Sequence, residues 1–124
     1  MLDYLTKQLV RHEGLRQFPY TDTVGKFTIG CGRNLTDVGI SEEEAMILLR
    51  NDIDKAGHSL TDHLGWWNGL DEARRIVLLN LCFNMGITRL LGFQKMLVAL
   101  QSGDYQKAAD EMENSSWHTQ VKGR

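Results

Sequence analysis

Two carboxyl groups and a hydroxyl near the amino terminus have the chemistry for acid–base catalysis. Glu13 ends a predicted helix, Asp22 follows in a turn-rich segment, and Thr28 lies one short strand further on. Two carboxyl groups across a cleft can hydrolyse a glycosidic bond: one protonates the leaving oxygen, and the other handles water or stabilises the cation. The negative end of the helix dipole disfavours an ionised Glu13, which suits a general acid. From spacing alone, a solvated Glu and a turn-forming Asp are the simpler interpretation, because both residue types mostly occupy surfaces.

Other chemistries find little support in the sequence. Gly30-Cys31-Gly32 begins a dinucleotide-binding fingerprint, but Leu35 occupies the position of its third glycine. The four histidines are scattered, and the two cysteines belong to no zinc motif. We therefore expect no metal and no cofactor, and we interpret both Cys31 and Cys82 as small buried hydrophobic residues.

A helix and a small sheet must position the two carboxyl groups. Apolar residues at helical spacing predict a helix over 2–13, which Gly14 ends. Glycines alternate with β-branched and aromatic residues over 15–40, and FTIGCG (27–32) is the best strand. This pattern predicts an antiparallel sheet of two or three short strands, which needs a helix to cover it.

The rest of the chain is predicted to be helical. Ser41 and Glu44 form a capping box that begins a helix running to about His63. A turn-rich connector (64–70) leads to a strongly apolar helix, capped by Asp71 and ended by Gly86, which we interpret as the central core helix. Two further helices are predicted over 88–113, and a last short helix from 114 to 117. This order predicts an α+β, mainly helical domain with two lobes and a cleft.

Composition fits one such domain. The chain has 124 residues, of which 42% are hydrophobic, and a net charge of -2. That charge favours neither nucleic acid nor anionic lipid as a partner. No apolar run has the length of a membrane helix, and the first residues contain no secretory signal, so we expect synthesis in a cytoplasm without membrane insertion.

The segment RHEGLRQFPYTDTVGKFTIGCGRNLT (11–36) resembles the catalytic segment of phage-type lysozymes, the family of the T-even phage endolysin (glycoside hydrolase family 24). The pattern Glu-Gly-x5-Tyr-x-Asp-x2-Gly-x2-Thr-Ile-Gly-x-Gly matches from Glu13 to Gly32. Further stretches over 70–86 and 92–121 also resemble the family, so the similarity covers nearly the whole chain. It implies a single lysozyme-like domain over 1–124, with a small β lobe (14–40), a connecting helix (41–63) and a helical lobe (1–13 and 64–124).

The resemblance also implies roles for individual residues. Glu13 would be the general acid, Asp22 the second carboxylate that stabilises the oxocarbenium charge, and Thr28 the residue that holds the attacking water. The family is read as inverting, which requires carboxyl groups about 6.5–9.5 Å apart. The substrate would be the β-1,4 bond between N-acetylmuramic acid and N-acetylglucosamine in peptidoglycan.

Other positions match less closely. Phe83 matches an aromatic residue of the family's cleft and Asn84 lies beside it, although packing in the core is an equally good interpretation of both. Asn34 and Met96 occupy cleft positions where the T-even enzyme has other residue types. Arg124 matches the arginine that faces the catalytic glutamate, and we expect it to support the acid.

In the family, one more helix follows the stretch that ends at Arg124, and the present sequence lacks it. We expect an endolysin of a phage or prophage that waits in the host cytoplasm and reaches the wall, in the periplasm, through a separate holin-like lesion. It would be a monomer, or self-associate through the uncovered surface. A non-catalytic, peptidoglycan-binding or structural remnant is the main alternative. A transglycosylase is a third, but it would not need Asp22 and Thr28.

Overall fold

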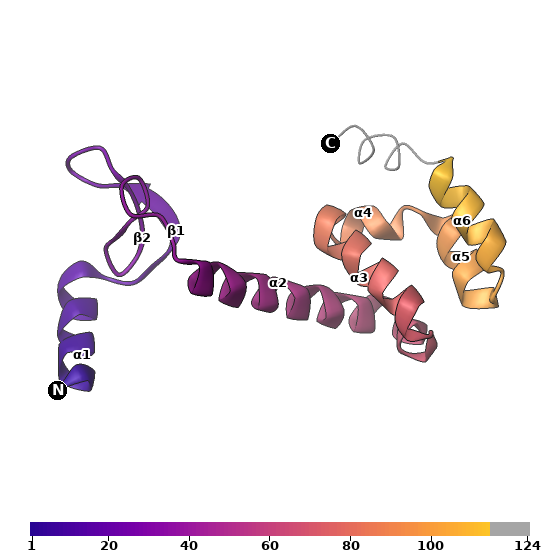
Figure 1. Cartoon of the computed structure of the whole chain (residues 1–124), viewed down its shortest axis with the longest axis horizontal. Coiled ribbons are helices and arrows are strands. Elements are labelled where there is room, and N and C mark those ends of the chain that lie inside the picture. Colours follow the sequence, from indigo (N-terminus) through magenta and orange to yellow (C-terminus); the bar gives the residue numbers. More distant parts are fainter. Residues whose placement is uncertain (115–124) are drawn as a thin grey trace. The chain divides into compact units, whose positions relative to one another are not determined.

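A computed structural model describes residues 1–114 of the chain (Figure 1). Its contacts divide the chain into two compact units, Met1–Ile47 and a second unit that begins at Leu48. The predicted class is confirmed, because helices dominate and one small antiparallel sheet accompanies them. The elements are α1 (Leu2–Glu13), β1 (Arg16–Thr21), β2 (Phe27–Gly30), β3 (Arg33–Asn34), α2 (Glu42–His63), the 3-10 helix η1 (Gly65–Gly69), α3 (Glu72–Met85), α4 (Ile87–Leu91), α5 (Gln94–Ser102) and α6 (Tyr105–Glu113).

The first unit begins with α1, which has the predicted bounds. Gly14 ends it with a φ of 75°, and its N–H donates to the carbonyl oxygen of Val10 at 2.8 Å. A positive φ is costly for other residues, so glycine suits this end of the helix. The chain therefore leaves the helix directly after Glu13 and enters the sheet.

The predicted sheet has three antiparallel strands in the order β1-β2-β3. Thr28 of β2 is the register partner of Tyr20 on one side and of Asn34 on the other. The predicted strand over 27–32 is shorter in the structure. It ends at Gly30, because Gly30 (φ 69°) and Gly32 (φ 81°) turn the chain back into β3.

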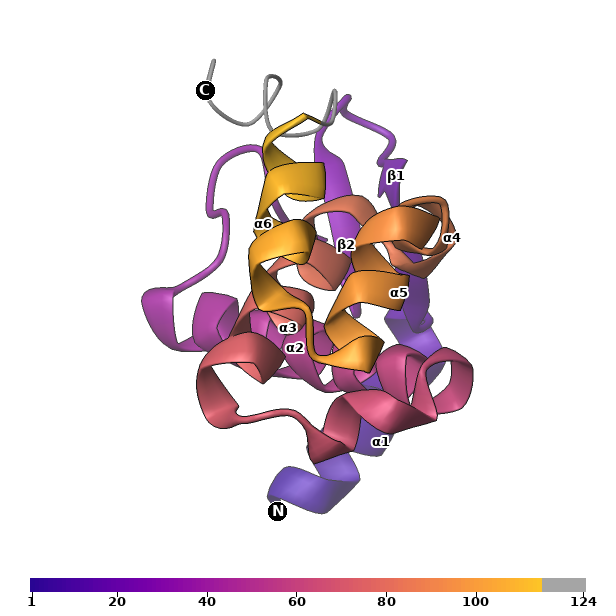
Figure 2. The same cartoon turned by 90° about the vertical axis from the view of Figure 1, so that its right-hand side faces the viewer.

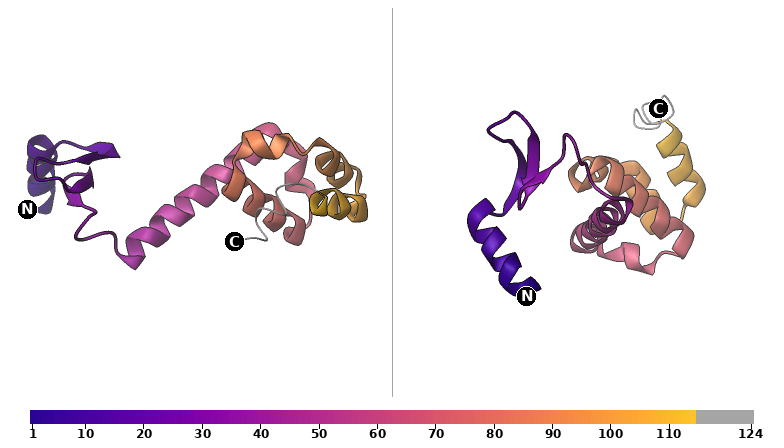
Figure 3. Two further views of the ribbon diagram at one scale, coloured as in Figure 1. Left: turned by 90° about the horizontal axis from the view of Figure 1, so that it is seen from above. Right: turned by 60° about the vertical axis from the view of Figure 1, so that its left-hand side comes forward.

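The capping box at the start of α2 is confirmed. Glu44 N–H donates to Ser41 Oγ at 3.0 Å, and Ser41 N–H donates to Glu44 Oε1 at 2.8 Å. The same carboxylate binds Arg33 of β3 through both oxygens, at 2.8 and 2.7 Å. The first turn of α2 is thus joined to the sheet within the first unit. Figure 3 shows that α2 then continues as one unbroken helix.

The apolar core lies in the second unit. Leu60, Leu78 and Leu90 are fully buried and come from α2, α3 and α4. Figure 2 shows α5 and α6 side by side, and both contribute to the same buried cluster. No apolar side chain of Met1–Ile47 is buried. The first unit is therefore held mainly by backbone pairing and polar contacts.

The connector between α2 and α3 packs against the apolar core. Trp67 is buried, and its indole N–H donates to Thr61 Oγ1 at 3.0 Å, while Trp66 is half-buried. Asp71 precedes α3, but the prediction that its side chain caps the helix is wrong. Its carboxylate instead pairs with Arg74 at 3.0 Å, which leaves the helix without a side-chain cap.

Two further details differ from the predictions. The segment 88–113 holds three helices instead of two, because a short α4 precedes the break at Gly92. Cys82 is buried as predicted, whereas Cys31 is exposed in the turn between β2 and β3. The short helix expected from 114 to 117 lies almost entirely outside the described residues. Among the residues that are described, no helix is long and apolar enough to cross a membrane.

The Glu44 contacts predict a pH-dependent stability. Hydrogen bonds from Arg33 and then Ser41 lower the pKa of Glu44 to about 2, from an ordinary value of 4.5. The folded state therefore binds this proton less tightly than the unfolded chain does. The resulting stabilisation is complete above about pH 4.5 and is lost as the pH falls through about 2.

We expect Glu44→Gln to lower the free energy of unfolding near pH 6, measured by urea denaturation, and the difference from the parent to shrink towards pH 2. Glu43→Gln is the matched control, because it removes a charge from the same helical turn and leaves Arg33 paired. A difference for Glu44→Gln that stays constant from pH 6 to pH 2 would contradict the ion-pair assignment.

Candidate functional site

Glu13 lies at the end of α1 with its side chain over Gly32. A Cβ atom added to Gly32 would stand 3.4 Å from Glu13 Oε2 and 3.7 Å from its Cδ. Gly32 also has a φ of 81°, so glycine is favoured there by its backbone conformation. The turn between β2 and β3 thus lies against one side of the Glu13 side chain, and Glu13 is otherwise exposed.

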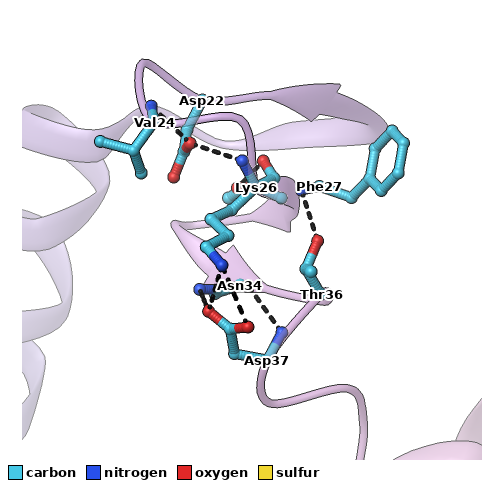
Figure 4. Close-up of polar contacts among 8 residues, drawn as sticks. Asp22, Val24, Lys26, Phe27, Asn34, Thr36 and Asp37 are labelled. Carbon is cyan, nitrogen blue, oxygen red and sulfur yellow. Dashed lines mark hydrogen bonds and ion pairs between the residues drawn. The ribbon is translucent and has the colours of Figure 1, made fainter.

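Asp22 shapes the connection between β1 and β2 (Figure 4). Its Oδ1 accepts hydrogen bonds from the backbone N–H groups of Val24, at 2.9 Å, and Lys26, at 2.8 Å. Asp22 therefore does form a turn, as the simpler interpretation predicts, but it uses only one carboxylate oxygen to do so. Oδ2 accepts no hydrogen bond from any residue in the described part of the chain, so it is available for another partner.

Thr28 is the one buried polar side chain among residues 1–114, with an exposed fraction of 4%. Its hydroxyl donates to the carbonyl oxygen of Lys26 at 3.0 Å. Since a hydroxyl has one hydrogen and two lone pairs, this bond leaves the oxygen able to accept. The strand thereby fixes the direction of the Thr28 hydroxyl.

The loop after β3 is tied to the Asp22 turn through Lys26. Lys26 Nζ pairs with Asp37 at 3.2 Å, and Asp37 Oδ2 accepts from Asn34 Nδ2 at 3.0 Å. Asn34 Oδ1 in turn accepts from Asp37 N–H at 3.0 Å. Both ends of the Asn34 amide are therefore used inside this loop (Figure 4), and substrate binding by Asn34 stays a prediction.

Sequence reasoning did not single out Lys26 and Asp37. The spacing of Asn34 and Asp37 is a signal that could have found the loop, because Asn and Asp side chains often bond to backbone two or three residues on. Lys26 carries no such signal, since the register of the sheet decides which residue faces the loop. Phe27 N–H adds a further tie by donating to Thr36 Oγ1 at 2.8 Å.

Phe83 and Asn84 lie on α3 in the second unit. Phe83 is 44% exposed, so it is not part of the buried cluster of this unit. Both residues line a groove together with Leu49, Ile53, Ile76, Leu79 and Asn80. Asn84 Nδ2 donates to the carbonyl oxygen of Asn80 at 2.8 Å, which holds the amide against its own helix.

Met96 and Arg124 are the remaining predicted site residues. Met96 is only 4% exposed and belongs to the buried cluster of the second unit, where it also lines an apolar groove with Leu81 and Leu100. Its packing role is thus evident, and a contact with substrate stays a prediction. Arg124 lies outside the described residues.

The predicted site residues are distributed over both units. Glu13, Asp22, Thr28 and Asn34 all belong to the first unit, and Thr28 and Asn34 are paired in the sheet. Phe83, Asn84 and Met96 belong to the second unit. Within residues 1–114, no group of three or more histidine, cysteine or acidic side chains could hold a metal ion.

Comparison with known proteins places this arrangement in a family. The model of the family described as phage lysozyme matches residues 10–124. The pre-baseplate central spike protein Gp5 of Enterobacteria phage T4 is 29% identical over 97% of this chain, which spans only 26% of the spike protein's length. Probable T4-type lysozymes 2 and 1 of Dictyostelium discoideum are 28% and 25% identical, and this chain covers 90% of each.

These alignments extend over 148 and 153 positions, which exceeds the 124 residues of the chain. The relatives therefore contain internal residues that have no counterpart here. The family match nevertheless includes Glu13, Asp22 and Thr28 and continues through every helix that the structure describes in the second unit. From this match over most of its length, the chain belongs to the phage lysozyme family.

Proposed function

We propose that this protein is a lysozyme that hydrolyses the β-1,4 bond between N-acetylmuramic acid and N-acetylglucosamine in peptidoglycan. The observation that carries the proposal is the family match over residues 10–124, which includes both carboxyl groups. Two of the similar proteins are named as probable T4-type lysozymes. Acid–base hydrolysis of this kind needs two carboxyl groups and water, and no cofactor.

In this proposal Glu13 is the general acid. Its carboxyl group is exposed at the end of α1 and lies over Gly32, where there is no side chain to cover it. It can therefore approach a glycosidic oxygen and donate a proton as the bond breaks. The absence of a Cβ at Gly32 supports this role, because it leaves the side of the carboxyl group that faces the turn uncovered.

Asp22 is the second carboxylate, which stabilises the oxocarbenium-like charge and orients water. The two backbone N–H groups that bind its Oδ1 fix the plane of the carboxylate. Oδ2 is then presented in a constant direction, and preorganised charge of this kind is effective in catalysis. Thr28 would hold the attacking water through the lone pairs of its fixed hydroxyl.

The remaining predicted residues would bind the sugar chain. The exposed ring of Phe83 offers an apolar face for a sugar ring, and Asn84 Oδ1 would accept a hydrogen bond from a hydroxyl or amide group. Asn34 and Met96 would border the bound chain, and Arg124 would support the acid. Peptidoglycan is the only partner this reaction needs, and the protein would act as a monomer or self-associate.

The biological setting we infer is that of an endolysin from a phage or prophage. It would be made in the host cytoplasm and reach peptidoglycan in the periplasm through a separate holin-like lesion.

A non-catalytic, peptidoglycan-binding remnant is the second candidate. The engagement of Asp22 and Asn34 in loop contacts favours it, because these contacts would preserve both residues without catalysis.

The first test compares the parent with Glu13→Gln. We expect the parent to reduce the turbidity of chloroform-treated Gram-negative cells, and the variant to be slower by about 10²–10⁴-fold, because an amide cannot donate the proton. The exposed position of Glu13 should leave the circular dichroism spectrum and thermal melt unchanged. Equal clearing by both proteins would remove Glu13 from the mechanism, and no clearing by two folded proteins would favour the remnant.

Asp22 permits a test that separates its turn from its chemistry. Asp22→Asn keeps an Oδ1 acceptor for the N–H groups of Val24 and Lys26, so it should fold as the parent does and lose most of the lytic rate. Asp22→Ala loses both hydrogen bonds and should also lose about 1–3 kcal/mol of stability. A parental rate for Asp22→Asn, measured by turbidity at equal concentration, would exclude a role in hydrolysis.

Gly32 has a matched control in Gly25, since both have a similar positive φ, +81° and +85°. Alanine at either position should cost about 1 kcal/mol through backbone strain. Only Gly32→Ala places a methyl group against the carboxyl group, 3.4 Å from Glu13 Oε2, which restricts its movement, so we expect this variant to be slower in lysis than Gly25→Ala. Equal rates for Gly32→Ala and Gly25→Ala would show that Gly32 does not support the acid.

A further inference from the structure

The turn that carries Gly32 is anchored on one side by a single ion pair. We infer that Arg33 and Glu44 are positioning residues for Glu13, which act by fixing Gly32 beneath its carboxyl group. This inference rests on the proposed function of Glu13. It assigns a role in catalysis to the first turn of α2, which otherwise only begins a helix.

The contact between Arg33 and Glu44 has two parallel hydrogen bonds. Arg33 Nη1 and Nη2 donate to Glu44 Oε1 and Oε2 at 2.8 and 2.7 Å, and Nη1 also donates to the carbonyl oxygen of Gly39 at 3.2 Å. A paired arginine fork restricts rotation as well as distance, unlike a single-point contact. Ser41 N–H binds the same carboxylate, so Glu44 is itself held against the helix start.

Besides this anchor, the turn is closed by a short stretch of pairing, Thr28 with Asn34 and Ile29 with Arg33. Gly30 and Gly32 both have positive φ, and a Cβ at Gly30 would meet no atom within 4 Å. Glycine adopts many conformations, so two of them in one turn leave it permissive. The outgoing strand β3 has only two residues, Arg33 and Asn34. Arg33 directly follows Gly32, and its guanidinium is the link from this strand to a helix.

The ion pair between Arg33 and Glu44 can hold the turn in the same position over a wide range of pH. Glu44 has a pKa of about 2 because it binds Arg33, so the ion pair stays intact at any pH at which cell walls are ordinarily digested. A displacement of about 1 Å of a reacting group can cost on the order of 100-fold in rate. Releasing Gly32 would let the Glu13 carboxyl group move by such an amount without unfolding the sheet.

The test uses the full chain with Arg33→Lys, Arg33→Met, Glu44→Gln and the double variant Arg33→Met/Glu44→Gln. Steady-state hydrolysis of soluble peptidoglycan fragments should give a kcat about tenfold lower for Arg33→Met and Glu44→Gln, with KM unchanged. Arg33→Lys keeps the positive charge but cannot make two parallel hydrogen bonds to Glu44, so its kcat should also fall. The double variant should be no slower than either single variant, because all of them break one contact.

Asp71→Asn is the matched control, since it breaks an ion pair of similar exposure, with Arg74, in the second unit. Its kcat should equal that of the parent. A second readout is independent of activity: 15N relaxation should show increased motion at Gly30, Cys31 and Gly32 in the Arg33 and Glu44 variants and not in the control.

Parental kcat in folded Arg33→Lys and Glu44→Gln would overturn the inference. A fall in kcat for Arg33→Met that is absent from Arg33→Lys and Glu44→Gln would also overturn it. That pattern would mean that Arg33 acts through its positive charge and not through its contact with Glu44. If the parent itself does not hydrolyse peptidoglycan, the proposed function fails. The relaxation data then still decide whether the ion pair fixes the turn. Unchanged motion at Gly32 in the Arg33 and Glu44 variants would show that it does not.

Discussion

The Glu44 carboxylate holds the first unit together at the point where its sheet meets a helix. It accepts hydrogen bonds from Ser41 and from both terminal nitrogens of Arg33. Charge-assisted bonds of this kind are short and directional, so one side chain can fix a helix start and a strand at the same time. A strand as short as β3 has few backbone bonds of its own, and this side-chain contact supplies what its length cannot.

The two units have different sources of order. The buried apolar cluster lies between Ala56 and Ala108, within the second unit, whereas Thr28 is the only buried side chain in Met1–Ile47. Small sheets cannot bury enough apolar surface to be stable alone. The first unit relies instead on turn glycines, on the Asp22 turn and on ion pairs. The proposed catalytic residues therefore lie where the chain is held by polar geometry.

This arrangement has a consequence for Asp22 and Thr28. Each uses part of its hydrogen-bonding capacity to build the sheet and retains part for another partner. A side chain whose direction is fixed by its own fold needs no reorganisation when charge develops nearby. In the proposed mechanism, the same bonds that form the hairpin would thus preorganise the second carboxylate and the water site.

Several features of the fold could be predicted because their causes are local. Gly14 ends α1 at the expected residue, and the capping box of Ser41 and Glu44 begins α2, because both depend on neighbouring residues along the chain. The break at Gly92 was expected, yet α4 was missed because a helix of one turn has too few residues for a periodic pattern. The prediction that Cys31 is buried is wrong, because its residue type does not indicate that it lies in an exposed turn.

The sequence by itself determined the family, the longer helices and the residues that carry the proposed chemistry, because motif spacing and helical periodicity are properties of the chain. Tertiary structure decided which groups meet. The approach of Glu13 to Gly32, the pairing of Arg33 with Glu44 and the link from Lys26 to Asp37 all join residues that are distant along the chain. Such contacts depend on strand register and on the path of each turn, which local patterns do not encode.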